Sequence, residues 1–389
     1  MEMVRYGIIG IGNMGTGHVN TLWKNEVPGA KLAAVCDINP AKLDWAKNLC
    51  GDSIAYFNDH TSLLDSGLVD AVLIATPHYF HPIIGMEAFS KKIHVLSEKP
   101  IGVYTKIIRE FMESAKNSGC AFGIMYNQRT NSLYQKMREL VQSGELGELK
   151  RCLWIITDWY RTQAYYNSGG WRATWAGEGG GVLINQCPHN LDLWQWIFGM
   201  PNKITAFCNF GKYHDIEVED DVTAYAEYPG GATGMFITTT GEFPGTNRLE
   251  ITGSRGKLVC EKGKLTFWKL KEDEREFTFS TDKGFASIDN EIIEFDIKNT
   301  GEEHKGILKN FTNHILNGEE LLAPGYEGIN GLSLSNAMML STWKNASVDL
   351  PNDGEEFYAE LQKRIAESDS EKAAVEEKAV NLDGTYGNK

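Results

Sequence analysis

The sequence lacks the features of a secreted, metal-binding or membrane protein. Its seven cysteines are scattered, and no two have C-x-x-C spacing, so they indicate neither a disulfide framework nor a zinc site. No apolar run reaches the roughly 20 residues of a membrane-spanning helix. The N-terminus has neither the basic region nor the cleavage site of a signal peptide. These absences predict a cytoplasmic protein without a membrane partner.

Positive charge is also scarce. The chain has 38 Lys and Arg against 52 Asp and Glu, a formal net charge of −14. An acidic chain is a poor match for nucleic acid, whereas a small neutral ligand stays possible. With 389 residues, 42% of them hydrophobic, the chain is long enough for two domains with separate cores.

A glycine-rich segment near the N-terminus predicts a dinucleotide site. Residues 4–10 predict a short buried strand, and a helix is expected at about 14–23. Between them, Gly10, Gly12 and Gly15 form the pattern G-x-G-x-x-G. The first glycine permits a tight turn, the second lets the backbone approach a pyrophosphate, and the third lets helix and strand pack closely. The N–H groups that begin the helix would then bind the phosphates.

An acidic residue follows at the distance expected for a ribose contact. The predicted strand KLAAVCD ends at Asp37, 22 residues after Gly15. An aspartate there accepts hydrogen bonds from the ribose hydroxyls of NAD and repels the 2′-phosphate of NADP. The sequence therefore predicts NAD; the alternative is that Asp37 only caps the helix that begins near Pro40.

The first half continues as alternating strands and helices. Strands are predicted at 69–77, 92–100 and 120–129, and helices at 40–50, 82–91 and 104–118. This alternation is typical of a parallel sheet with helices on both faces, whose ligands bind beyond the carboxyl ends of the strands. The polar residues expected at those ends are Thr76, His78, His81, Glu98, Lys99, Gln128 and Arg129.

After about Leu146 the pattern changes to short strands separated by turns. Strands are predicted at 149–157, 203–211, 222–229, 232–240, 247–253 and 257–268, and helices at 182–198, 305–316 and 328–344. The segment FWKLKEDEREFTF predicts a charged hairpin at an edge. This half therefore predicts an α+β domain with a large, mostly antiparallel sheet. Residues after about 369 are charged and poor in apolar side chains, which predicts a loose tail or a single helix.

Four motifs in order resemble the Gfo/Idh/MocA oxidoreductase family over roughly residues 1–352. They are GIIGIGNMGTGH, ATPHYFHP, the SEKP box at 97–100 and GGGVLINQCPHNLD. The resemblance implies an α/β Rossmann domain at 1–128 and an α+β domain with an open-faced sheet at 129–352. Its last helices would pack back on the first domain, and 353–389 would form a C-terminal extension.

The resemblance also implies a reaction. Family members transfer a hydride to a nicotinamide from a secondary ring hydroxyl, which predicts a sugar, a glycoside or a cyclitol as substrate. It further implies a homodimer or homotetramer formed through the open sheet. The residues expected to bind NAD are Gly10, Gly12, Asn13, Met14, Gly15, Asp37, Thr76, Pro77, His81, Glu98, Lys99 and Gln128.

Lys99 and His189 match the catalytic residues of the family. A partly buried lysine beside a cationic nicotinamide should have a lowered pKa and could take the hydroxyl proton. His189 would bind the same hydroxyl or share its proton. The alternatives are that Lys99 only pairs with an acid such as Glu98, and that His189 is a satisfied core residue.

Asn185 departs from the family pattern, in which an aspartate often precedes the histidine by four residues. Asparagine cannot ionise, but it can donate and accept hydrogen bonds to a sugar hydroxyl. On the helix expected at 182–198, Asn185, His189 and Asp192 share one face. Structural and functional roles are equally open for Asp192.

The segment TDWYRTQAYYNSGGWRATWAGEGGG is dense in aromatic side chains. Aromatic rings stack on sugar faces, while polar groups bind the hydroxyls. The predicted substrate-binding residues are Asp158, Tyr160, Trp171, Arg172 and Trp175, together with Asn185 and His189. Alternatively, these aromatics contact another subunit or pack under the sheet.

Two other functions stay open. One is a redox-neutral glycosidase or lyase that keeps NAD bound and oxidises its substrate only transiently. The other is a non-catalytic dinucleotide-sensing regulator, which would need neither Lys99 nor His189. The histidines have no partner carboxylates at ligand spacing, so no metal is predicted.

Overall fold

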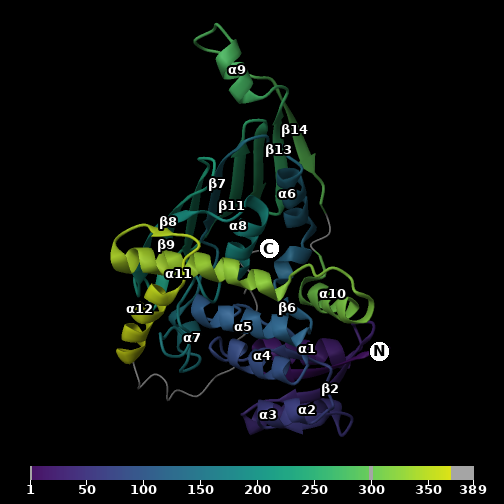
Figure 1. The fold of residues 1–389 in the computed structure, drawn as a ribbon. Coiled ribbons are helices and arrows are strands. Elements are labelled where there is room, and N and C mark those ends of the chain that lie inside the picture. Colours follow the sequence, from purple (N-terminus) through teal and green to yellow (C-terminus); the bar gives the residue numbers. More distant parts are fainter. Residues whose placement is uncertain (1, 298–300, 369–389) are drawn as a thin grey trace.

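The computed structural model describes residues 2–297 and 301–368. It has two sheets, a parallel sheet flanked by helices and a larger sheet that extends away from it (Figure 1). The predicted tail after 369 lies outside the described residues. Within the described ranges, none of the helices combines the length and apolar character that a membrane span requires.

The first sheet has six parallel strands in the order β3-β2-β1-β4-β5-β6. The strands are β1 (Val4–Ile9), β2 (Ala30–Cys36), β3 (Ala55–Phe57), β4 (Ala71–Ile74), β5 (His94–Ser97) and β6 (Phe122–Ile124). The helices between them are α1 (Asn13–Trp23), α2 (Pro40–Cys50), α3 (His60–Asp65), α4 (Phe80–Ser90) and α5 (Thr105–Ser118). The predicted alternation is confirmed, although the short β3 and α3 were not predicted. The strand order reverses between β1 and β4, where doubly wound sheets bind their ligands.

A 3-10 turn (Asn127–Thr130) and α6 (Ser132–Gln142) lead into the second sheet. Its nine strands have the order β14-β13-β12-β11-β7-β10-β9-β8-β15. They are β7 (Leu149–Ile156), β8 (Lys203–Phe210), β9 (Glu219–Glu227), β10 (Thr233–Thr239), β11 (Asn247–Gly253), β12 (Gly256–Glu261), β13 (Lys264–Leu270), β14 (Asn290–Phe295) and β15 (Val348–Asp349). Only β7 and β10 pair in parallel among these strands, so the mostly antiparallel sheet is confirmed.

Helices cover one face of this sheet. Trp194 of α8 (Pro188–Phe198) packs on Phe236 of β10, with ring centroids 5.4 Å apart. Helix α11 (Gly328–Lys344) contacts β8, α8 and α5, and so joins the two halves of the molecule (Figure 1). The remaining helices are α7 (Gln163–Tyr166), α9 (Glu274–Ser280), α10 (Glu303–Asn317) and α12 (Glu355–Ala366). In the described part of the chain, the other face of the sheet is not covered by helices (Figure 1).

Two predictions for the second half were wrong. The strand expected at 257–268 is a hairpin of β12 and β13, because Lys262 and Gly263 adopt left-handed φ angles of 51° and 71° and reverse the chain. The charged hairpin expected in FWKLKEDEREFTF contains a helix instead. The Asp273 side chain accepts a hydrogen bond from the N–H of Arg275 and caps α9, which lies at the far tip of the sheet (Figure 1).

Candidate active site

The glycine loop between β1 and α1 has the shape that a dinucleotide requires. A Cβ on Gly10, which has φ +93°, would lie 2.6 Å from the carbonyl oxygen of Ala75, and one on Gly15 would lie 1.9 Å from that of Gly10. Beside Gly12 the space is open, since a Cβ there would meet nothing within 4 Å. Helix α1 begins without a side-chain cap or an acidic residue in its first turn, which includes Asn13 and Met14. Its first N–H groups therefore fit phosphate oxygens.

Asp37 lies at the carboxyl end of β2 and faces this loop. Its Oδ2 accepts a hydrogen bond from the Ile11 N–H at 2.6 Å, and its Oδ1 accepts one from the Asn39 N–H at 2.8 Å. Asn39 caps α2 by accepting from the N–H of Ala41, so Asp37 is not the helix cap. The half-buried carboxylate keeps lone pairs that fit ribose hydroxyls.

At the end of β4, Thr76 and His81 differ in their surroundings. Thr76 Oγ1 is buried and has no hydrogen-bond partner among the described residues, as expected of a group that meets a cofactor. Both ring nitrogens of His81 lie against carbonyl oxygens, those of Thr76 at 2.6 Å and Pro100 at 2.7 Å. His81 therefore links the segment after β4, which contains Thr76 and Pro77, to the segment after β5, which contains Pro100.

Lys99 follows β5 and extends toward the second domain. Its Nζ donates to the backbone carbonyl of Asn185 at 2.9 Å. Burial lowers the pKa of Lys99, and the nearby cations Arg172 and Arg161 lower it further against the opposing charges of Glu98 and Glu178. A lysine with a lowered pKa is suited to accept a proton.

The Glu98 carboxylate contacts groups other than the Lys99 ammonium. Its Oε1 lies 2.7 Å from Nε2 of buried His18, and its Oε2 accepts from the backbone N–H of Lys99 at 3.1 Å. Burial alone would raise the pKa of Glu98, but the hydrogen bond and charge of His18 outweigh it and hold this pKa at about 2. The Lys99 ammonium is therefore not taken up by a Glu98 ion pair.

His189 lies in the first turn of α8 and lines a cavity of about 550 Å³. Its Nδ1 is buried and meets no partner in residues 2–297 and 301–368. Burial, together with the charge of Lys99, holds the pKa of His189 well below its ordinary value, so the imidazole is neutral. A satisfied core histidine would have both nitrogens bonded.

The helix expected at 182–198 begins only at Pro188, so this prediction was wrong at its N-terminal end. The segment before it forms an irregular turn, in which the N–H of Cys187 donates to the carbonyl of Val182 at 2.8 Å. The N–H groups of Gly181 and Leu183 donate to Oε1 of Glu219 in β9, at 2.9 and 3.0 Å. Asn185 therefore lies before the helix and does not share a face with His189. Its side-chain Nδ2 donates to Oε1 of Glu178.

Asp192 has a structural partner. Its carboxylate forms a two-pronged ion pair with Arg129, with Nε–Oδ2 at 2.8 Å and Nη2–Oδ1 at 2.6 Å, and both side chains are 1% exposed. Arg129 also contacts Glu327 at 2.5 Å. Because Arg129 follows β6 and Asp192 lies three residues after His189, the pair holds the α8 helix against the parallel sheet.

Only some of the predicted binding residues meet at the cavity. Gln128, Asp158 and His189 line it, with Trp159 and Asn190 beside them. Asn190 Oδ1 is another buried atom that no described residue contacts by a hydrogen bond. The cavity thus presents polar atoms from both halves of the molecule.

The predicted aromatic residues are dispersed. Tyr160 is 45% exposed and packs on Phe243. Trp171 meets the edge of His78, and the Arg172 guanidinium lies 4.6 Å from the centre of the Trp171 ring, on the Lys99 side of the site. Trp175 lies in a core cluster with Phe210 and Trp343, as the packing alternative predicted.

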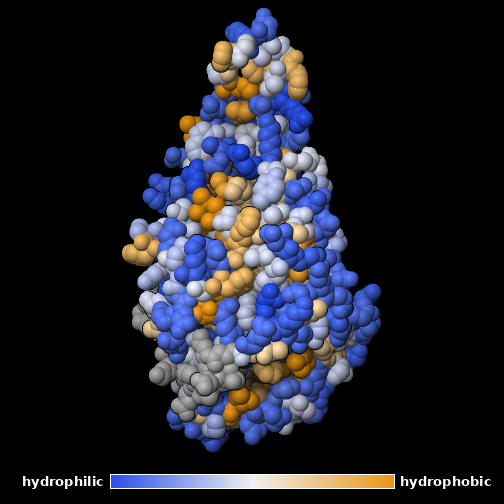
Figure 2. All heavy atoms as spheres, turned by 90° about the vertical axis from the view of Figure 1, so that its left-hand side faces the viewer, coloured by the Kyte–Doolittle hydropathy of each residue, from blue (hydrophilic) through white to orange (hydrophobic). Residues whose placement is uncertain are grey.

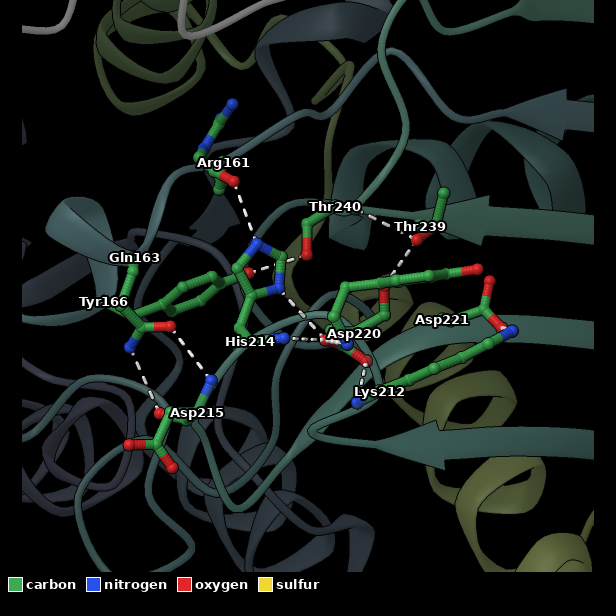
Figure 3. Close-up of polar contacts among 12 residues, drawn as sticks. Arg161, Gln163, Tyr166, Lys212, His214, Asp215, Asp220, Asp221, Thr239 and Thr240 are labelled. Carbon is green, nitrogen blue, oxygen red and sulfur yellow. Dashed lines mark hydrogen bonds and ion pairs between the residues drawn. The ribbon is translucent and has the colours of Figure 1, made fainter.

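A separate network fixes the loop that carries Asp158 and Tyr160. Figure 3 shows the His214 ring between the Arg161 carbonyl oxygen, 2.9 Å away, and the Asp220 carboxylate, 3.0 Å away. The Tyr166 hydroxyl donates to Thr240 in the same network. The loop is therefore anchored to the second sheet at its base.

Sequence reasoning missed three buried side chains around Lys99. Glu178 contacts Asn185, Glu219 holds the glycine segment before it, and His18 binds Glu98. The signal for Glu178 was an acid placed directly before three glycines, while His18 and Glu219 had none that local spacing reveals. Among the residues that the structure describes, no three His, Cys, Asp or Glu side chains are grouped as metal ligands are.

Comparisons with known proteins cover both halves of the chain. Residues 4–126 match the family model described as "Oxidoreductase family, NAD-binding Rossmann fold", and residues 134–259 match "GFO/IDH/MocA C-terminal domain". Myo-inositol 2-dehydrogenase of Thermotoga maritima is 24% identical over 89% of this chain and 98% of that protein.

Two solved structures have the same architecture. The WlbA dehydrogenase of Chromobacterium violaceum, crystallised with NADH and UDP-GlcNAcA, is 26% identical, with a TM-score of 0.78 over 90% of this chain and 97% of that one. Levoglucosan dehydrogenase, in complex with NADH and levoglucosan, has a TM-score of 0.74 at 19% identity over 90% of this chain and all of its own.

Proposed function

Because the chain belongs to the GFO/IDH/MocA family of NAD-binding oxidoreductases, we propose that it oxidises a secondary ring hydroxyl of a sugar, glycoside or cyclitol. The carrying observation is that Lys99, whose pKa is lowered, donates to the carbonyl of Asn185, four residues before His189. The buried Nδ1 of His189 has no hydrogen-bond partner among the described residues. A dinucleotide-sensing regulator would need neither group.

The residues divide the reaction between them. When bound, NAD supplies the acceptor for the hydride that leaves the carbinol carbon. Lys99 removes the hydroxyl proton, because its neutral amine has a lone pair and burial favours that form. His189 hydrogen-bonds the same oxygen and orients the carbon–hydrogen bond. The Asn185 carbonyl holds the amine of Lys99 in place.

The cavity supports a polar ring as substrate. Its volume of about 550 Å³ suits a small ligand, and it presents the amide of Gln128, the carboxyl of Asp158 and the amide of Asn190. Burial raises the pKa of Asp158, and its carboxyl oxygens can accept hydrogen bonds from hydroxyl groups. The names of the relatives, an inositol dehydrogenase and a dehydrogenase crystallised with a nucleotide-linked sugar, support the same substrate class.

The testing experiment supplies purified protein with NAD and a panel of inositols, free sugars and glycosides. We expect steady NADH accumulation, followed at 340 nm, with one of these classes. Consumption of a substrate without NADH would instead support the redox-neutral glycosidase or lyase. Binding of NAD without any turnover across the panel would contradict the dehydrogenase.

Asp37 is predicted to select NAD. A 2′-phosphate would lie against its carboxylate, and like charges in contact cost several kcal/mol, so kcat/KM with NADP should be lower by about 100-fold. In the variant Asp37→Ser, the ratio of kcat/KM with NAD to kcat/KM with NADP should fall at least tenfold. A wild-type enzyme with a lower KM for NADP than for NAD would contradict the assignment.

We also propose that the chain forms a homodimer or homotetramer through the uncovered sheet face. This face presents Phe207 of β8, 66% exposed, and Tyr225 of β9, 42% exposed, in neighbouring strands. Figure 2 shows apolar residues among polar ones along the side of the molecule that carries β8 and β9. Light scattering should give two or four times the 43.4 kDa chain mass.

A further inference from the structure

The cavity beside His189 presents hydrogen-bond acceptors that the protein itself does not use. Asn190 lines this cavity from the first turn of α8 and is 5% exposed, and its Oδ1 meets no donor among the described residues. Asp158 lines the same cavity from the loop after β7. Because buried acceptors in folded proteins are nearly always paired, we expect a bound ligand to supply the donor for Asn190.

The contacts of Asn247 fix Asp158 as an acceptor at the cavity wall. The Oδ1 of Asn247 accepts a hydrogen bond from Nε1 of Trp154 at 3.1 Å, so its Nδ2 is the atom that donates to the Asp158 carboxylate. This amide supplies a hydrogen bond but no positive charge.

Asp158 also lacks a cation in contact with it. It forms no ion pair with any described residue, although the charge of Arg161 favours its ionised form. The guanidinium groups of Arg161 and Arg172 lie 5.3 and 4.8 Å from the centre of the Tyr165 ring, and neither arginine lines the cavity. Burial raises the pKa of Asp158, while the amide of Asn247 and the charge of Arg161 oppose that effect. A cation bound in the cavity would therefore favour the carboxylate.

The other charges around the cavity are mostly negative. Of the described residues that line it, Glu261 and Glu303 are acidic and Lys262 is the single lysine. Glu261 is paired with Arg248 at 2.9 Å, and the imidazole of His189 is neutral. An anionic ligand would be repelled by these carboxylates, whereas a cationic one would be attracted.

We propose that the substrate ring carries a protonated amine, which Asp158 and Asn190 bind while a hydroxyl of the same ring reaches His189. The substrate class is then an amino sugar or an aminocyclitol, so this inference rests on the proposed function and narrows its substrates. An ammonium brings both donors and the missing positive charge, whereas a hydroxyl brings a single donor without charge. A carboxylate or phosphate at the same position of the ring is disfavoured.

Binding to the NADH-loaded protein tests the proposal. Isothermal titration calorimetry compares glucose and scyllo-inositol with their aminodeoxy isomers, in which one hydroxyl after another is replaced by an amine. We expect at least one isomer to bind about 10- to 100-fold more tightly than its parent, because hydrogen bonds to charged groups are stronger than those between neutral groups. A series in which no amine binds more tightly than its parent would overturn the proposal.

Two variants assign the preference to its residues. Asp158→Asn keeps the shape of the side chain and removes its charge, so the ratio of amine affinity to parent affinity should fall by about tenfold or more. Asn190→Leu removes the second acceptor and should lower the affinity for the amine by about tenfold.

The matched control is Asp221→Asn, which removes an equal charge from a partly exposed pair with Lys212 outside the cavity. This variant should keep the wild-type ratio of affinities. A ratio that stays the same in Asp158→Asn, or that falls equally in Asp221→Asn, would contradict the assignment.

The calorimetry needs no turnover, so it separates this inference from the proposed function. Preferential binding of an amine without NADH formation from NAD would reject the dehydrogenase and support the amine site. Steady NADH formation from neutral rings, with no gain in affinity from an amine, would reject the amine site and support the dehydrogenase.

Discussion

Lys99→Ala is expected to lower kcat by about 10²- to 10⁴-fold, the usual contribution of a positioned general base. NADH affinity should stay close to that of the wild type, because the glycine loop, Asp37 and Thr76 lie on other strands. Lys99→Arg is the matched control: it keeps the positive charge but cannot give up its proton, so it should be nearly as inactive. Stopped-flow kinetics and fluorescence titration with NADH measure the two quantities separately.

The pH dependence of kcat/KM shows which protonation state of Lys99 is active. Lys99 acts in its neutral form, so kcat/KM should rise as pH increases through its pKa and then level off. Because burial lowers this pKa, the rise should occur below the ordinary value for lysine. In Lys99→Ala this rise of kcat/KM with pH should disappear. Loss of NADH binding in the variant would identify the lysine as a cofactor anchor instead.

Arg129→Met is expected to reduce stability by about 3–5 kcal/mol, because it leaves Asp192 buried without its charge partner. The same change should lower kcat, since the ion pair holds the helix that carries His189. Unfolding in urea and the kinetic assay can be run on the same preparation.

Two further variants test whether the stability lost in Arg129→Met comes from the buried ion pair. Arg129→Met with Asp192→Leu removes both charges and should recover much of the lost stability. Lys309→Ala, which breaks a partly exposed pair with Glu302 at 2.7 Å, should cost no more than about 1 kcal/mol. A loss of that small size in Arg129→Met would show that the buried pair does not join the two halves.

Much of the fold was predictable because its signals are local. Helix α2 begins where Asn39 and Pro40 indicate, since the cap and the proline act within one turn. The alternation of strands and helices needs no knowledge of distant contacts either. The early start predicted for α8 failed for the opposite reason: Glu219, in a strand 36 residues after Leu183, binds the N–H groups of Gly181 and Leu183 and fixes a loop there, a contact that no local pattern indicates.

For the candidate site, the sequence indicates which residues to examine but not how their side chains are placed. Motifs predict Lys99, His189 and the glycine loop by type and order, and in the structure Lys99 contacts the carbonyl of Asn185 in the segment that leads to His189. Trp175 and Trp171 are equivalent in the sequence, yet one lies in a core cluster and the other beside His78. The pairing of Glu178 with Asn185 depends on a loop conformation that composition does not determine.

The cavity beside His189 has a kinetic consequence. Its rim includes the exposed turn at Lys262 and Gly263, and none of its lining residues belongs to the glycine loop. With the substrate in this cavity, as proposed, its way out does not pass the glycine loop. The ketone product of the proposed reaction would then be able to leave before the reduced nicotinamide, in the order set by the two dissociation rates. Reduced nicotinamide retained in this way would be able to pass the hydride, taken from the carbinol carbon of the first substrate, to a second carbonyl compound.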